Sequence, residues 1–179
     1  MRRLLGLGAA AVASAALVAP LGPGPAQADD LTFPYVNDFT TGSGGTLTGS
    51  AAIVDGRLRL TPAEFGRAGA WAMDDAFPSG LGLDVEFDYA MYAPVDRGAD
   101  GLLLYLADGA AAAGVGGTGA ALGYACRTEQ NQGTGPCETA GLPGGFAAVA
   151  LDLYGNFSLP INDSGPGQQP DTVTVRGSG

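Results

Sequence analysis

The chain has 179 residues, a formal net charge of −10 at pH 7 and no histidine. The lack of histidine excludes catalysis by Ser-His-Asp or Cys-His groups, His-ligated zinc and the helical metalloprotease motif. The excess of acids repels phosphate groups, so nucleic acid is not an expected partner. Neither a basic patch nor a second apolar span is present, and we therefore expect no membrane partner.

Residues 1–28 have the pattern of a secretory signal peptide. Arg2 and Arg3 form a positively charged start, an apolar run follows, and Ala26–Ala28 matches a small-x-small cleavage site. We therefore expect a secreted, extracellular protein whose mature domain spans 29–179. That length is sufficient for one domain with a hydrophobic core.

Short strand-like runs follow one another through the mature chain, with glycine and proline between them. The run 40–50 is rich in Gly, Ser and Thr and is predicted as a loop. No segment has a sustained helical period, so we predict an all-β fold, either a sandwich or a barrel. The predicted strands, in chain order, are 51–54, 57–60, 69–73, 82–92, 101–107, 122–126, 144–152 and 171–176.

Three of these runs carry more specific signals. The pair Asp55-Gly56 between two strand-like runs predicts a hairpin with a type I′ turn. The run 101–107 is continuously apolar, which predicts a fully buried strand. The run 82–92 alternates and predicts a half-buried strand. Its inward face is Leu83, Val85, Phe87 and Tyr89, and its outward face is Asp84, Glu86 and Asp88.

The two cysteines, Cys126 and Cys137, lie on either side of a polar, glycine-rich segment. In a secreted chain an even number of cysteines indicates a disulfide. Closing so short a loop stabilises the fold by about 3 kcal/mol in the chain-entropy model. We therefore predict a structural disulfide between them.

Oxygen donors follow the predicted strand 144–152 at regular spacing. Asp152 supplies a carboxylate, Tyr154 a backbone carbonyl and Asn156 a side-chain amide. Positions i, i+2 and i+4 of an extended segment lie on one side. Calcium prefers carboxylate, carbonyl and amide oxygens, so the spacing is compatible with a calcium site. A strand that ends in an Asx-type turn with solvated side chains is the alternative.

Four motifs, taken in order, resemble the bacterial branch of the L-type (legume-type) lectin family. They are Gly-Ala-Asp-Gly at 98–101, Gly-Ala-Ala-Leu-Gly at 119–123, the stretch 142–156 and Val-Thr-Val-Arg-Gly-Ser at 173–178. The resemblance covers residues 33–179. It implies a two-sheet antiparallel jelly-roll sandwich of the concanavalin A-like type.

The resemblance also implies which residues bind sugar. Asp100 matches the aspartate that accepts hydrogen bonds from sugar hydroxyls, and the peptide bond Ala99–Asp100 before it is expected to be cis. Asn156 matches the asparagine that donates its amide to the sugar and also binds calcium. Gly119 or Ala120 would supply a backbone N–H to the sugar.

The implied metal site departs from the family pattern. Asp152, the carbonyl of Tyr154 and Asn156 match calcium ligands, and Asp163 or Asp171 would supply the second acid. Plant members carry a glutamate where this chain has Ala150, and a histidine further on, so no Mn²⁺ site is expected. Family members also continue into further strands beyond the position of Gly179. The resemblance therefore implies a domain that is incomplete at its C-terminus and has an unpaired strand edge.

Two other functions compete with the lectin hypothesis. Asp84, Glu86 and Asp88 on one strand face suggest a retaining glucanase, which needs two carboxyl groups about 5–5.5 Å apart. Their order differs from the glucanase motif, and no Trp-rich cleft accompanies them. A structural or adhesive surface module without sugar binding is the third hypothesis. The sequence favours a secreted, non-catalytic domain that binds carbohydrate with the help of calcium.

Overall fold

The computed structural model describes residues 31–80, 82–92, 98–128, 136–160 and 165–178. The predicted signal peptide 1–28 and the candidate calcium ligand Asp163 lie outside these residues. The elements are β1 (Gly45–Gly49), β2 (Ala52–Val54), β3 (Arg57–Arg59), β4 (Gly69–Met73), β5 (Gly101–Ala107), the 3-10 helix η1 (Gly119–Ala121), β6 (Arg127–Thr128), β7 (Cys137–Thr139), β8 (Gly145–Asp152) and β9 (Thr172–Arg176).

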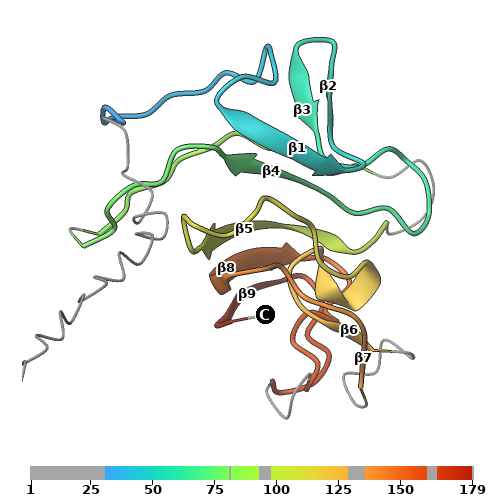
Figure 1. Ribbon diagram of the computed structural model, residues 1–179. Helices are drawn as coiled ribbons and strands as arrows, with labels where there is room; N and C mark the ends of the chain where they lie inside the picture. The colour runs from blue at the N-terminus through green and yellow to red at the C-terminus, as the bar shows by residue number, and fades with distance from the viewer. Residues whose placement is uncertain (1–30, 81, 93–97, 129–135, 161–164, 179) are drawn as a thin grey trace, which may run out of the picture.

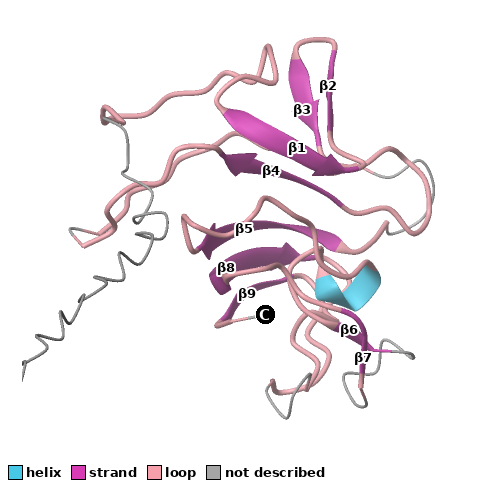
Figure 2. Ribbon diagram, in the orientation of Figure 1, coloured by secondary structure: helices cyan, strands magenta, loops and turns pink. Residues whose placement is uncertain are grey.

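The strands form small antiparallel sheets, as Figure 1 shows. The largest contains β5, β8 and β9 in that order, and the pairs β1–β4, β2–β3 and β6–β7 form separate two-stranded sheets. In the described residues the short helix η1 is the only helical element, beside the β6–β7 hairpin in Figure 2. The all-β class is confirmed, whereas the two-sheet jelly roll stays a prediction. Among the described residues, no helix is both long and apolar enough to span a bilayer.

Local sequence signals located several elements correctly. The β2–β3 hairpin turns at Asp55 and Gly56, whose φ values of 50° and 67° suit a type I′ turn. The strands β4, β5, β8 and β9 lie where alternation or apolar runs predicted them. The predicted disulfide between Cys126 and Cys137 is present, with its Cα atoms 5.6 Å apart.

Three strand predictions were wrong. β1 lies inside the predicted loop 40–50, because tertiary pairing with β4 determines it. An added Cβ at Gly45 would lie 2.2 Å from the Trp71 ring, so glycine is what lets that ring cross the strand. The run 122–126 forms turns after η1, and Tyr124, Ala125 and Cys126 are buried without strand pairing. The run 82–92 belongs to no strand, because it pairs with none of the described residues.

The core lies on one face of the β5–β8–β9 sheet. On β8 this face carries Ala148 and Ala150, whose small side chains leave room for Tyr124 and Phe157 to cover the sheet. The opposite face is open, since Val149 and its neighbours on β5 and β9 remain exposed. The prediction of a fully buried strand at 101–107 was therefore wrong: β5 is covered on one side only. The buried cluster is Ala121, Tyr124, Ala125, Cys126, Leu142, Ala148, Ala150 and Phe157.

We expect the Phe157→Ala variant to lose about 3 kcal/mol or more of unfolding free energy. Phe157 is fully buried, and its ring meets the Tyr124 ring edge-on at a centroid distance of 6.3 Å, so truncation leaves a cavity. Urea denaturation measures the change. Phe65→Ala is the matched control, because the Phe65 side chain is fully exposed. Equal midpoints for the two variants would contradict the assignment of this core.

Candidate functional site

The candidate site begins where β8 ends in a tight turn around the Asp152 carboxylate. The two carboxylate oxygens accept hydrogen bonds from the backbone N–H groups of Gly155 and Phe157, both at 2.8 Å. Asp152 is only 1% exposed, so these bonds satisfy a charge that water does not reach. Gly155 has a φ of 85°, and an added Cβ would lie 2.1 Å from the nitrogen of Pro170. The turn therefore requires both the carboxylate and the glycine.

Asp100 lies beside this turn because of the antiparallel register. Gly101 pairs with Asp152, so the residue before β5 adjoins the residues that follow β8. The backbone carbonyl of Asp100 accepts hydrogen bonds from the N–H groups of Leu153 at 3.0 Å and Tyr154 at 3.2 Å. The peptide bond between Ala99 and Asp100 is cis, as the resemblance implies. The two ends of the site are thus joined through their backbones.

Asn156 connects the turn to Asp100. Its Nδ2 donates a hydrogen bond to Oδ1 of Asp100 at 3.3 Å. Asn156 is only 7% exposed, and its buried Oδ1 has no hydrogen-bond partner. Exchanging the amide oxygen and nitrogen would place an oxygen against the Asp100 carboxylate, so Asp100 determines the orientation of the amide. An oxygen that is buried without a partner indicates a missing donor or cation.

The Asp100 carboxyl is half-buried, and burial raises its pKa above the usual value. The nearby negative charge of Asp152 raises this pKa further, whereas the hydrogen bond from Asn156 lowers it. The Asp152 carboxylate therefore disfavours the ionised form of the Asp100 carboxyl beside it. A bound cation would relieve this repulsion.

The loop after Asn156 is held by an arginine from β9. Nη1 of Arg176 donates hydrogen bonds to the backbone carbonyls of Phe157 and Leu159, and the guanidinium lies 5.3 Å from the centroid of the Phe157 ring. Ser158 adds hydrogen bonds from its Oγ to the carbonyls of Gly155 and Gly167. The sequence did not single out Arg176. Alternation along β9 groups Arg176 with Thr172 and Thr174 on a polar face, which would be expected to face water, whereas the structure pairs this face with Ala148 and Ala150 on the core side.

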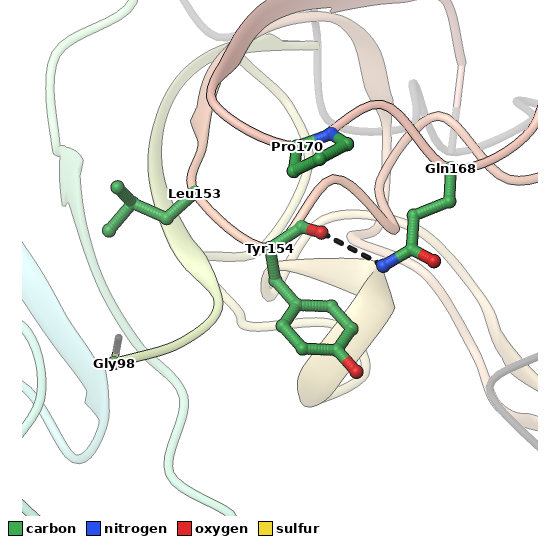
Figure 3. A pocket seen from close by; sticks show the side chains of 5 residues that line it. All are labelled: Gly98, Leu153, Tyr154, Gln168 and Pro170. Carbon is green, nitrogen blue, oxygen red and sulfur yellow. Dashed lines mark hydrogen bonds between the residues drawn. The ribbon is translucent and has the colours of Figure 1, made fainter. Parts of the chain in front are cut away.

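A pocket of about 290 Å³ lies beside the turn that follows β8. Its lining is Gly98, Leu153, Tyr154, Gln168 and Pro170, shown in Figure 3. In that view the Tyr154 ring lies below a hydrogen bond at 3.0 Å from Gln168 Nε2 to the Tyr154 carbonyl. The Tyr154 side chain is about half exposed. The pocket thus has an aromatic wall close to the Asp100 backbone, a composition suited to a small polar ligand.

The residues predicted to bind calcium offer a partial ligand set. Asp152, the Tyr154 carbonyl and Asn156 are within one five-residue turn, and the unpartnered Asn156 oxygen suits a hard cation. Each Asp152 oxygen keeps a second lone pair beyond the amide that it accepts. The described residues contain no group of three or more acidic or cysteine side chains that could hold a metal ion. Because calcium takes six to eight oxygens, these residues fit a weak site completed by water or by a further acid.

The remaining candidates lie elsewhere. Gly119 begins η1, and in the described chain no hydrogen bond joins it to Asp100 or Asn156. Ala121, at the other end of η1, belongs to the same buried cluster as Phe157, so the helix and the site loop share one core. The glucanase candidates Asp84, Glu86 and Asp88 lie on an exposed segment outside the described strands.

Comparison of the chain with models of known protein families found no match, and comparison with curated proteins found none either. The function of the site is therefore inferred from its own residues.

We expect Asp152→Asn to cost about 2 kcal/mol of stability even in calcium-free buffer. An asparagine has one acceptor oxygen, so its NH₂ group would face one of the two backbone N–H groups that Asp152 now satisfies. Thermal melts in chelator measure the loss. Asp75→Asn makes the same change on an exposed carboxylate and should leave the melting temperature unchanged. A native-like melt for Asp152→Asn would show that the turn does not depend on this carboxylate.

We expect Asp100→Asn to raise the melting temperature by a few degrees at neutral pH in calcium-free buffer. The change removes a half-buried charge beside Asp152 and keeps an oxygen that can accept from Asn156. The raised pKa means that the folded state binds the proton more tightly than the unfolded state. The contribution of Asp100 to stability is then fully present below the unfolded pKa and is lost as the pH rises through the folded value.

The advantage of Asp100→Asn should accordingly shrink as the pH falls through this range. Melting both chains from neutral to acidic pH measures the trend. A native chain that is the more stable of the two at neutral pH would contradict the unfavourable environment of Asp100.

Proposed function

We propose that this chain is a secreted, non-catalytic carbohydrate-binding domain of the L-type lectin kind, assisted by calcium and built on a concanavalin A-like jelly roll. The observation that carries the proposal is the contact between Asp100 and Asn156. A carboxylate acceptor and an amide donor, far apart in sequence, lie 3.3 Å apart beside a small pocket. A hydroxyl both donates and accepts hydrogen bonds, so sugar hydroxyls can use both kinds of group.

The residues divide the work of binding a sugar. The Asp100 carboxylate accepts hydrogen bonds from sugar hydroxyls, and Asn156 Nδ2 donates to a sugar oxygen. The exposed ring of Tyr154 offers an apolar surface to the C–H groups of the sugar, since tyrosine combines an apolar body with a polar tip. Asp100 and Asn156 are held by backbone hydrogen bonds and by burial, so little conformational freedom is lost on binding.

Calcium would be held by Asp152, the Tyr154 carbonyl and Asn156. When bound, it would supply positive charge to a site with two carboxylates, and the unpartnered Asn156 Oδ1 could serve as one of its ligands. The turn itself is already closed by the Asp152 hydrogen bonds. The ion would therefore contribute charge balance rather than the path of the backbone.

The test combines calcium titration with binding to a glycan array. We expect calcium to raise the melting temperature and glycan retention to disappear in chelator. Asp100→Ala and Asn156→Ala should each weaken retention by about tenfold or more, because each removes a hydrogen bond that involves a charged or buried group. Asp75→Ala, an exposed aspartate, is the matched control.

Each result identifies the part of the proposal that it tests. Retention that is unchanged in chelator would refute the role of calcium. Retention that needs calcium but survives both Asp100→Ala and Asn156→Ala would refute this location. A folded chain that retains no glycan in calcium would refute carbohydrate binding and favour the structural or adhesive module.

A further inference from the structure

A second loop brings Gln168 to the candidate site, and the backbone of this loop is fixed on both sides of Gln168. The N–H of Gln169 donates to the carbonyl of Gly155 at 2.7 Å. On the other side, the N–H of Gly167 donates to the carbonyl of Ser158 at 3.2 Å, and the Ser158 hydroxyl donates to the carbonyl of Gly167 at 2.7 Å. The loop is thus held against the turn after β8 without the Gln168 side chain.

The Gln168 side chain is oriented as well, because its amide has a fixed acceptor. Nε2 donates a hydrogen bond to the Tyr154 carbonyl at 3.0 Å. Exchanging the amide oxygen and nitrogen would place two oxygens against each other, so Tyr154 determines which end of the amide is free. Figure 3 shows Oε1 directed away from the Tyr154 carbonyl. Within the described residues, Oε1 and the second N–H of Nε2 form no hydrogen bond.

The lining of the pocket indicates which ligand group this amide would meet. Besides Gln168, the lining residues are Gly98, Leu153, Tyr154 and Pro170, and none of them carries a charge. An ionised ligand group would therefore find no opposite charge in this wall. A hydroxyl both donates and accepts hydrogen bonds, so it can use the free oxygen and the free N–H of the amide.

We propose that Gln168 determines which sugar the site selects, through hydrogen bonds from its amide to one hydroxyl of an uncharged sugar ring. The inference rests on the proposed carbohydrate function and adds a selecting residue to it. The contacts that carry it lie entirely between described residues. A site oriented to bind a substrate hydroxyl discriminates against the analogue that lacks it, because a polar group is then left without its partner.

A structural role for Gln168 is the alternative, in which its amide only fastens the loop to the Tyr154 carbonyl. The backbone bonds on either side of Gln168 already hold the loop, and the residue is exposed. The two roles differ in one measurable respect. A structural residue affects the binding of every sugar alike, whereas a selecting residue is coupled to one hydroxyl.

The test compares the native chain with Gln168→Ala by calorimetry in calcium. The probes are the methyl glycosides of glucose, galactose and mannose, and the monodeoxy forms of the one that the native chain binds best. We expect one monodeoxy sugar to bind the native chain about tenfold more weakly than its parent. The same two sugars should bind Gln168→Ala with equal affinity. Gln169→Ala is the matched control, because Gln169 is exposed and does not line the pocket, and it should keep the native difference.

A second variant, Gln168→Glu, keeps the length of the side chain and loses the N–H that binds the Tyr154 carbonyl. Its carboxylate has no donor to hold it there, so this variant should also lose the discrimination. If Gln168→Ala weakens both sugars by the same factor, or changes neither, the inference is overturned while the carbohydrate site stands. A native chain that binds none of the three parent glycosides would overturn it too. Glycan retention on the array would then show whether the carbohydrate function fails with it.

Discussion

The site depends on the hydrogen bonds between the Asp152 carboxylate and the N–H groups of Gly155 and Phe157. These bonds close the turn after β8 and determine where Asn156 lies relative to Asp100. Because Asp152 is almost completely buried, its charge is satisfied by these two amides within the described structure. A water-exposed carboxylate could hold the same turn only weakly, since solvent would compete for both oxygens.

The turn packs against the hydrophobic core, yet it holds buried polar groups. Phe157, the residue whose N–H binds Asp152, packs over the small residues of β8, and Arg176 fixes its carbonyl from β9. Beside this turn, the half-buried carboxylate of Asp100 lies near that of Asp152. The amide oxygen of Asn156 has no hydrogen-bond partner. Such groups reduce stability, and proteins keep them mainly where a ligand completes them.

The described fold leaves two apolar surfaces uncovered. One is the outer face of the β5–β8–β9 sheet, where Leu104, Val149 and Val175 are exposed at neighbouring register positions. The other is the apolar side of 83–89. Exposed surfaces of this kind normally meet another polypeptide segment. The other face of that segment carries Asp84, Glu86 and Asp88, which are exposed.

Short-range chemistry made several features predictable from the residues alone. They are the β2–β3 turn at Asp55-Gly56, the strands β4, β8 and β9, the disulfide, and the Asp152–Asn156 turn as a group of oxygen donors. Motif resemblance added Asp100 and its cis peptide bond. Three outcomes required the tertiary structure: β1 pairs with β4, 82–92 pairs with no described strand, and β5 is covered on one face. These outcomes depend on which distant segments meet, and no local propensity encodes that choice.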